Sequence, residues 1–500
     1  MTLQTIGVVG AGTMGAGIAQ VAAAAGHPVK LLDVRPGAAQ AAIDQTAKAL
    51  AALVDKGRLS ADARGATLAR LSAVETSADF ADAELVLEVI VEKLEAKQQL
   101  LRELEAIVSP RTVLASNTSS ISITAIANGL QHPQRVVGMH FFNPVPLMKL
   151  VEVVAGAETD AAVAQAVFDL AKRWGKTPVH AKSTPGFIVN RIARPYYAET
   201  LALLQEQAAT PAAIDALARS AGFRMGTCEL MDLIGHDVNY AVTQSVFEAN
   251  YFDRRYTPSL VQKALIDGGR LGRKVGKGFY DGVPSPEPAS ADLPLLPGPL
   301  TLCGEGPLAG LLQAWLTRRG VEFARVPVSA WTGLKIDEIE MRVTDGRTAI
   351  RLAAESHRPE LAVIDLPLAG DKLPSIAVAF AASASAATRE TVSTTLQACG
   401  WQVRELRDVP GLWVARTVCM LINEAADAVH QGVCDENDAD LAMKLGTNWP
   451  AGPFEWLEQI GVEAVVAVLD HLHAATRNER YRTSPLLQQR LWESRLRTRV

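Results

Sequence analysis

The sequence of 500 residues lacks the features of a membrane, secreted or zinc-binding protein. It has no run of about eighteen apolar residues, the length that a membrane-spanning helix needs. Its five cysteines are odd in number and include no C-x-x-C pair, so neither a disulfide framework nor a metal site is indicated. An apolar strand pattern begins already at Ile6 and leaves no room for a signal peptide. We therefore expect a protein of the reducing cytoplasm.

An excess of positive charge is also missing. Lys and Arg number 49 against 54 Asp and Glu, which gives a net charge of −5 and no broad positive field for nucleic acid or an anionic membrane. Hydrophobic residues make up 48% of the chain, enough for buried cores, which excludes intrinsic disorder. At roughly 100 to 200 residues per domain, the length predicts about three to five domains. Chemistry on a small molecule is the expected class of function.

The N-terminal part predicts an α/β domain. A buried strand over 6–9, a glycine-rich turn, a helix over 14–25 and a second strand over 29–32 form a β-α-β unit. Its right-handed crossover implies a parallel sheet covered by helices. Three more strand-like runs follow, at 85–89, 113–115 and 136–139. We predict a doubly wound Rossmann domain over residues 1–183.

From residue 184 the pattern becomes helical. Long amphipathic segments cover 188–207, 211–221 and 237–249, with few strand candidates between them. We predict an all-α domain over 184–282. Six prolines among small residues then predict an extended interdomain linker over 283–299.

The C-terminal part repeats the helical domain. The segment Pro-Gly-Phe-Ile-Val-Asn-Arg at 185–191 recurs as Pro-Gly-Leu-Trp-Val-Ala-Arg at 410–416, an offset of 410 − 185 = 225. Residues 229–235 correspond to 455–461 at an offset of 226. A register held over this distance with one insertion is an internal duplication. We predict a degenerate Rossmann-like domain over 300–407 and a second all-α copy over 408–500.

The degenerate domain has lost the residues of a nucleotide site. Pro307 follows its Gly304-x-Gly306 turn, no acidic residue ends the next strand, and the run 376–381 holds neither His nor Glu. The asparagine of 185–191 has become Ala415. A residual nucleotide role for the turn and a turn merely inherited by duplication both stay open. We expect one active site per chain, with the second helical copy packing on the first in cis; a homo-oligomer is a further alternative.

A dinucleotide-binding turn opens the first domain. The residues from 10 to 15 read Gly-Ala-Gly-Thr-Met-Gly, a G-x-G-x-x-G turn between strand and helix. The first glycine permits the tight turn, the second lets the backbone approach a pyrophosphate, and the third allows close helix packing. The pyrophosphate then meets unpaired amides and the positive end of the helix dipole. The predicted cofactor contacts are Gly10, Gly12, Thr13, Met14 and Gly15.

An acidic residue completes this motif. Asp33 lies 33 − 10 = 23 residues after Gly10, close to the ~20 expected for a carboxylate that accepts hydrogen bonds from the adenosine ribose. It would repel a 2′-phosphate, so NAD is favoured over NADP. Arg35 argues in the other direction, because an arginine can accommodate that phosphate. FAD, or a glycine turn without any ligand, are the alternatives.

Two polar residues interrupt apolar runs after the predicted sheet. His140 ends the run 136–139, and Glu152 lies inside 150–154. A buried carboxylate needs a partner, since an unpaired one is strongly destabilising or takes up a proton. A histidine is a suitable partner, and the pair would leave the second ring nitrogen as a general base. A structural histidine and an edge-strand carboxylate pointing at water are the alternatives.

Longer motifs resemble the 3-hydroxyacyl-CoA dehydrogenase family. They are Ala-Ser-Asn-Thr-Ser-Ser at 115–120, Gly-Met-His-Phe-Phe-Asn-Pro at 138–144, Lys-Leu-Val-Glu-Val at 149–153 and Thr-Pro-Gly-Phe-Ile-Val-Asn-Arg at 184–191. The resemblance extends to about Asp281, and the repeated helical domain is similar to bacterial members that act on 3-hydroxybutyryl-CoA or 3-hydroxyadipyl-CoA in fatty-acid or aromatic-acid (phenylacetate) catabolism. It implies NAD-dependent, reversible oxidation of (3S)-3-hydroxyacyl-CoA to 3-oxoacyl-CoA.

The resemblance also implies roles for single residues. It makes His140 the catalytic base and Glu152 its orienting carboxylate, with Ser119 and Asn190 hydrogen-bonding the reacting oxygen. Without it, Ser119 could equally cap the next helix and Asn190 could be an exposed helix residue. The further implied contacts are Glu92 and Lys97 at the nicotinamide ribose, Asn143 at the nicotinamide, and Lys56, otherwise a solvated surface charge, at the coenzyme A phosphates.

Two other functions compete with this one. A dehydrogenase of a free β-hydroxy acid resembles the chain less, because such enzymes use a catalytic lysine and lack the His-Phe-Phe-Asn-Pro motif. A non-catalytic relative, similar to the lens crystallins built on this fold, is disfavoured by the intact set of His140, Glu152, Ser119 and Asn190. We therefore expect an enzyme that uses NAD.

Overall fold

The computed structural model describes residues 3–284, 293–368 and 374–497, which form two compact units. Unit 1 comprises Met1–Arg191 and Gly432–Thr447, and unit 2 comprises Ile192–Gln431 and Asn448–Val500. Half of the predicted linker, 285–292, lies outside the described residues. None of the helices described is both long and apolar enough to cross a membrane. The predicted domain boundaries stay predictions.

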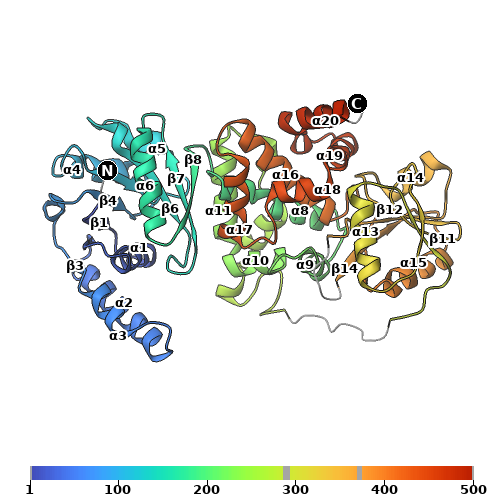
Figure 1. Cartoon of the computed structure of the whole chain (residues 1–500), viewed down its shortest axis with the longest axis horizontal. Helices are drawn as coiled ribbons and strands as arrows, with labels where there is room; N and C mark the ends of the chain where they lie inside the picture. Colours follow the sequence, from blue (N-terminus) through green and yellow to red (C-terminus); the bar gives the residue numbers. More distant parts are fainter. Residues whose placement is uncertain (1–2, 285–292, 369–373, 498–500) are drawn as a thin grey trace. The chain divides into compact units, whose positions relative to one another are not determined.

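Unit 1 contains a twisted sheet of eight strands (Figure 1). They are β1 (Ile6–Val9), β2 (Val29–Leu32), β3 (Leu71–Ala73), β4 (Leu85–Glu88), β5 (Val113–Ser116), β6 (Val136–Phe141), β7 (Leu150–Ala155) and β8 (Thr177–Lys182). Their order is β3-β2-β1-β4-β5-β6-β7-β8, and only the β6–β7 pair is antiparallel. The carboxyl ends of β1, β2, β4 and β5 therefore meet at one edge, where such sheets bind ligands.

Helices cover this sheet. They are α1 (Thr13–Ala24), α2 (Ala38–Asp55), α3 (Ala61–Leu68), α4 (Leu94–Glu105), α5 (Ile123–Ala127), α6 (Ala161–Arg173), α7 (Val189–Ile192) and α17 (Glu436–Thr447), with 3-10 turns η1 (Ser77–Phe80) and η2 (Pro133–Arg135). Small residues such as Gly15 and Ala19 are buried on α1 and let it lie close to β1. Ile6, Val8 and Leu85 are fully buried beneath it. The predicted Rossmann fold is confirmed.

Unit 2 contains the helical copies. The first has α8 (Arg194–Gln205), α9 (Pro211–Ser220), α10 (Thr227–Ile234), α11 (His236–Ala249), α12 (Leu260–Asp267), η3 (Arg254–Tyr256) and η4 (Arg273–Val275). The second has α16 (Val414–His430), α18 (Pro453–Ile460), α19 (Val462–Thr476), α20 (Pro485–Arg497) and η5 (Glu479–Tyr481). The single helix predicted over 188–207 is wrong. It breaks at Ala193, because Pro195 has no N–H group for a continuous helix.

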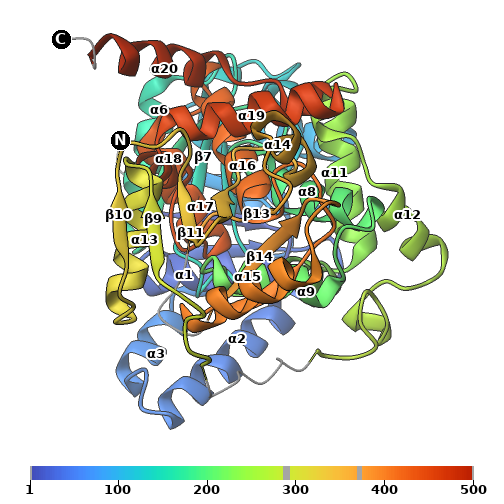
Figure 2. The same ribbon diagram turned by 90° about the vertical axis from the view of Figure 1, so that its right-hand side faces the viewer.

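A second sheet completes unit 2. Its strands are β9 (Leu300–Cys303), β10 (Ala324–Val326), β11 (Gly333–Ile336), β12 (Ile339–Val343), β13 (Leu361–Ile364), β14 (Ser375–Phe380) and β15 (Gln402–Glu405), with helices α13 (Pro307–Arg318), α14 (Ala349–Ser356) and α15 (Ala386–Ala398). The order is β10-β9-β11-β12-β13-β14-β15. Figure 2 shows α13 along β9, as α1 lies along β1. The antiparallel hairpin strand β11 stands where β4 stands in the first sheet.

The two sheets share one register. Leu150 pairs with Thr177 across β7 and β8, and Ser375 pairs with Gln402 across β14 and β15, so both differences are 375 − 150 = 402 − 177 = 225. The duplication predicted for the helical domains therefore extends to the second half of the sheets. Each residue of β6 to β8 has a counterpart 225 positions later.

Buried ion pairs join the two helical copies within unit 2. Glu199 on α8 is fully buried and lies 2.8 Å from the Arg416 guanidinium on α16, which also holds Glu206 at 2.8 Å. Its counterpart Glu424 on α16 accepts from Tyr256 at 2.6 Å. The expected packing of the second copy on the first in cis is thus built around buried carboxylates. Each carboxylate takes its partners from the other copy.

Replacing Arg416 by Met should destabilise the full chain by about 3–5 kcal/mol, because it leaves the Glu199 carboxylate buried without its main partner. Urea unfolding followed by circular dichroism measures the change. Arg351→Met, which breaks an exposed i,i+4 pair with Glu355 on α14, is the matched control and should lose less than about 1 kcal/mol. Equal losses in the two variants would contradict the role of the buried pair.

Candidate active site

The glycine turn presents free backbone to a ligand. Gly10 has a φ of 108°, a conformation that favours glycine, and a Cβ added to it would meet the backbone of Val89. Gly12 is exposed, and a Cβ there would meet nothing within 4 Å. It precedes the twelve-residue helix α1 without any side-chain cap. The N–H groups of Thr13 and Met14 at this helix start therefore suit a pyrophosphate.

Asp33 lies beside this turn at the end of β2. Its Oδ2 accepts from the Ala11 N–H at 2.8 Å, and its Oδ1 lies 3.0 Å from Arg35 Nε. The hydrogen bond from the Arg35 side chain lowers the pKa of Asp33 to about 2, against a smaller effect of burial. The carboxylate is therefore charged at neutral pH. Arg35 is largely exposed and forms an ion pair with Asp33.

Glu92 anchors the loop that follows β5. Its Oε1 accepts from Thr118 Oγ1 at 2.7 Å, from the Ser119 N–H at 2.9 Å and from Ser120 Oγ at 3.0 Å. Burial alone would raise the pKa of Glu92, but Lys97 and the donors from Thr118 and Ser119 outweigh it and lower the pKa. These hydrogen bonds to Glu92, which we call the Glu92 hub, hold the Ser119 hydroxyl in place. The alternative role of Ser119 as a helix cap is wrong, because Ser122 caps α5.

Lys97 is placed beneath this loop. Its side chain is 1% exposed, and its ammonium lies 2.9 Å from Glu88 and 3.2 Å from Glu92. Ser116 also hydrogen-bonds Glu88. The lysine thus reaches a ribose site only through Glu92. Sequence reasoning missed Glu88, although its position at the carboxyl end of a central parallel strand is a signal for a ligand-edge residue.

His140 and Glu152 form a buried pair across β6 and β7. They are directly opposed in the antiparallel register, and His140 Nδ1 lies 2.6 Å from Glu152 Oε2. His140 is 6% exposed and Glu152 0%. The other carboxylate oxygen accepts the N–H groups of Ile188 at 2.9 Å and Val189 at 3.0 Å. The alternative that Glu152 lies on an edge strand and points at water is wrong, because β8 pairs with β7 on its outer side.

Asn190 follows these two N–H groups on α7. Its Nδ2 donates to the Ser119 carbonyl at 3.3 Å, so the two residues predicted at the reacting oxygen are neighbours. Asn143 is exposed just after the strand that carries His140. Lys56 is exposed at the end of α2. Asn117, which sequence reasoning missed, accepts the Phe141 N–H at 2.8 Å and so ties β5 to β6.

The second sheet carries different residues at the positions of His140 and Glu152. Asp365 stands opposite Ala377, as His140 stands opposite Glu152, at the same offset of 225. The Asp365 carboxylate accepts from the N–H groups at the start of α16, including Val414 at 2.7 Å. Burial raises the pKa of Asp365 to about 6, although these N–H donors act in the opposite direction.

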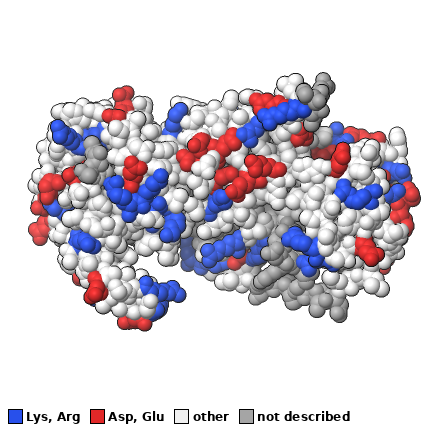
Figure 3. Space-filling view, viewed as in Figure 1, with Lys and Arg blue, Asp and Glu red and all other residues white. Residues whose placement is uncertain are grey.

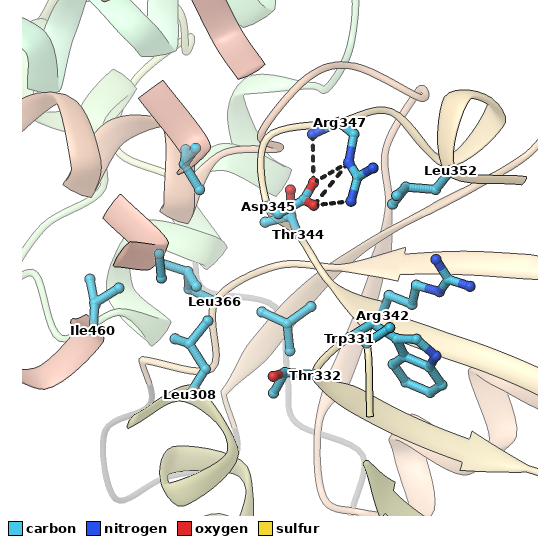
Figure 4. A pocket seen from close by; sticks show the side chains of 14 residues that line it. Leu308, Trp331, Thr332, Arg342, Thr344, Asp345, Arg347, Leu352, Leu366 and Ile460 are labelled. Atoms are coloured by element: carbon cyan, nitrogen blue, oxygen red, sulfur yellow. Dashed lines mark hydrogen bonds and ion pairs between the residues drawn. The ribbon is translucent and has the colours of Figure 1, made fainter. Parts of the chain in front are cut away.

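The counterpart of the dinucleotide turn is closed. A Cβ on Gly461, between α18 and α19, would lie 3.2 Å from Pro307, so the second helical copy packs on the start of α13. A cavity of about 160 Å³ remains behind it, where Asp345 pairs with Arg347 (Figure 4). Ligand pockets usually measure ~300–1,000 Å³. The interpretation of the Gly304 turn as inherited rather than nucleotide-binding is the one that this packing supports.

Comparisons with known families match most of the chain to domains of one enzyme family. The NAD-binding domain of 3-hydroxyacyl-CoA dehydrogenase matches residues 5–184, and its C-terminal domain matches twice, at 186–282 and 411–499. The 3-hydroxybutyryl-CoA dehydrogenase reduced Rossmann-fold domain matches 341–410. The chain belongs to the 3-hydroxyacyl-CoA dehydrogenase family. It is an NAD-dependent oxidoreductase of 3-hydroxyacyl-CoA, and the predicted duplication is confirmed.

Similar proteins cover either the whole chain or its first half. The 3-hydroxyadipyl-CoA dehydrogenase of Escherichia coli K12 is 45% identical over 98% of both chains. The crystal structure of a 3-hydroxybutyryl-CoA dehydrogenase from the same species has 43% identity and a TM-score of 0.87 over 99% of both chains. The mitochondrial hydroxyacyl-coenzyme A dehydrogenase of Sus scrofa is 39% identical over 55% of this chain and 89% of its own.

Replacing Asp33 by Asn should reduce the preference for NAD over NADP, because the charge that repels a 2′-phosphate is lost. Comparing kcat/KM for the two coenzymes in the wild type and the variant measures this. Since the pKa of Asp33 is about 2, the carboxylate stays charged throughout the neutral and mildly alkaline range, and the wild-type preference should not change with pH there. An unchanged preference in Asp33→Asn would show that Asp33 does not face the ribose.

Proposed function

We propose that His140 is the general base that takes the proton of the C3 hydroxyl when (3S)-3-hydroxyacyl-CoA is oxidised, and that Glu152 orients it. The observation that carries this proposal is the 2.6 Å contact between His140 Nδ1 and Glu152 Oε2 in a buried register pair. The contact leaves Nε2 as the nitrogen for proton transfer. Glu152 stabilises the imidazolium that forms when this nitrogen takes the hydroxyl proton.

Ser119 and Asn190 hold the reacting oxygen. The Ser119 hydroxyl and the Asn190 side-chain amide donate to it and stabilise the charge that builds there as the proton leaves. Their 3.3 Å contact through the Ser119 carbonyl supports a shared site. In the reduction direction the same two donors polarise the keto group. The Glu92 hub fixes the position of Ser119 for this task.

The residues at the glycine turn fit NAD, which when bound supplies the acceptor for the hydride from carbon 3. The uncapped helix start after Gly12 suits the pyrophosphate, and the charged Asp33 suits the adenosine ribose. Glu92 and the exposed Asn143 contact the nicotinamide half in this proposal. Lys97 acts through Glu92, because its ammonium is buried between two carboxylates.

The acyl group of the substrate is short or carries a terminal carboxylate in our proposal. The full-length relatives support it, since one is named for 3-hydroxyadipyl-CoA and the other for 3-hydroxybutyryl-CoA. Rates of NAD reduction on these two substrates and on longer 3-hydroxyacyl-CoAs decide between the two. A ratio of kcat/KM in favour of the adipyl substrate assigns the chain to dicarboxylic acyl chains, as in aromatic-acid catabolism.

Three further proposals concern the setting of the enzyme. Lys56, exposed between α2 and α3, is the proposed contact to the coenzyme A phosphates. All five cysteines are free, which supports work in a reducing compartment such as the cytoplasm. Acidic and basic side chains are interspersed on the face shown in Figure 3, which favours a small-molecule partner over a polyanion. A homo-oligomer stays a proposal.

His140→Gln and Glu152→Gln should each lower kcat by roughly 10² to 10⁴, the usual contribution of a general base, while the Kd for NAD changes little. Both side chains act on the reacting oxygen and lie on strands β6 and β7, away from the glycine turn. Steady-state rates and a fluorescence titration with NADH measure the two quantities. Near-normal turnover in His140→Gln would refute the mechanism.

A further inference from the structure

One helix of the second helical copy belongs to the unit of the first sheet. The segment Gly432–Thr447, with α17, falls in unit 1, whereas the rest of that copy falls in unit 2. α17 packs against β7 and β8, the last two strands of the sheet. The counterpart of α17 in the first helical copy is α9, which instead packs on β14 of the second sheet. Each copy thus lends one helix to the opposite sheet.

Two hydrogen bonds seat this segment on the edge strand β8. The His180 N–H donates to Asp438 Oδ2 at 2.9 Å, and the Lys182 N–H donates to the Val433 carbonyl at 2.8 Å. The second bond has a counterpart 225 positions away, from the Arg407 N–H to the Ala208 carbonyl. The segment therefore occupies outward-facing N–H groups of an edge strand, which are otherwise open to other chains.

Gly446 near the end of α17 makes the closest approach. A Cβ added to it would lie 2.7 Å from Leu150 Cδ2 and 3.1 Å from Val189 Cγ2. Both neighbours are buried, Leu150 at 0% and Val189 at 4% exposure. A methyl group here must therefore displace the buried side chains of Leu150 and Val189, or the helix itself.

These two neighbours flank the catalytic carboxylate. Leu150 precedes Glu152 by two residues on β7, so a shift of Leu150 is passed to Glu152 along the same strand. The Val189 N–H is one of the two donors to Glu152 Oε1, and Asn190 follows it directly. Cys434, just before α17, also lies near Glu152: burial, then the charges of Asp438 and Glu152, raise the pKa of its thiol to about 12.

The second sheet, which lacks an equivalent of the His140–Glu152 pair and is called the inert sheet below, accommodates a side chain at the position equivalent to Gly446. At the offset of 226 that relates Glu229 to Glu455, Gly446 corresponds to Ser220 on α9. Ser220 Oγ accepts from the Ser375 N–H at 2.6 Å, and Ser375 is the counterpart of Leu150. Ser220 thus packs on the second sheet, which has no glutamate at the position of Glu152. Gly446 packs on the first sheet, beside the strand that carries Glu152.

We propose that α17 is a positioning element of the active site, and that Gly446 lets it press Leu150 and Val189 into the arrangement that fixes Glu152, and through it His140 and Asn190. The proposal rests on the function proposed for the His140–Glu152 pair. Gly446 touches neither substrate nor cofactor and acts through the two side chains it contacts. The second helical copy has no catalytic site of its own in this account, but it completes the one in the first half.

Substituting Gly446 by Ala and by Val in the full chain tests this role. We expect kcat to fall by on the order of 10-fold for Ala and 10²-fold for Val, because displacements of about 1 Å at a catalytic group have effects of that size. The Kd for NAD should stay unchanged. The pH profile of kcat should also change, because a displaced Val189 no longer holds Glu152 Oε1 in the position that keeps Oε2 against His140.

Three further variants make the test specific. Gly310→Ala and Gly310→Val on α13, where a Cβ meets nothing within 4 Å, are the matched controls and should leave kcat and its pH profile unchanged. Adding Leu150→Val to Gly446→Ala removes the Cδ2 contact and should restore most of the lost kcat.

The outcomes separate this proposal from the function on which it rests. A lower melting temperature with an unchanged kcat and pH profile in both Gly446 variants would overturn the positioning role and leave a packing role only. Failure of Leu150→Val to restore kcat would overturn it as well. If His140→Gln keeps near-normal turnover, the proposed function itself fails. A loss in His140→Gln together with no loss in the Gly446 variants refutes only the inference.

Discussion

The arrangement of unit 1 depends on one buried carboxylate, that of Glu152. It is 0% exposed on β7, between strands β6 and β8, where an unpaired charge would be strongly destabilising. One oxygen holds His140 Nδ1 and the other holds two N–H groups at the start of α7, so strand β6, strand β7 and the segment that carries Asn190 meet at this group. The same contacts that satisfy the charge fix the geometry of His140, the proposed base. In that proposal, folding and catalysis impose the same requirement on Glu152.

The second sheet separates these two requirements. Its α16 also begins with unpaired N–H groups near the sheet, and they also need a buried acceptor. Asp365, at the position of His140, reaches these groups directly, while Ala377 replaces the glutamate. A single carboxylate thus caps the helix without a histidine between strand and helix. The buried acceptor for the helix N–H groups is kept after the duplication, whereas the pair proposed for proton transfer is not.

Local motifs made much of this predictable from the sequence, and contacts distant in sequence explain the rest. The glycine turn, Asp33 and the opposed His140 and Glu152 could be predicted because short spacings and strand periodicity place them. The buried Glu88–Lys97 pair escaped, since both residues read as ordinary charges on a strand end and a helix. The break at Ala193 needed attention to Pro195. The place of α17 in unit 1 depends on pairings some 250 residues apart, such as that of His180 with Asp438, which no local pattern encodes.

Joining two copies in one chain lets them differ. Two identical subunits must carry the same residue at both symmetric positions, so a change that suits one sheet is imposed on the other. In a duplicated chain, Gly446 can serve the catalytic sheet while its counterpart Ser220 hydrogen-bonds the inert one. The contacts of the two buried glutamates between the copies remain nearly symmetric: Glu199 accepts from Tyr481 at 2.8 Å, and Glu424 accepts from Tyr256 at 2.6 Å. Symmetry is thus kept where the two helical copies pack on each other. It is lost where α17 packs on the first sheet and α9 on the second, because only the first sheet carries the His140–Glu152 pair.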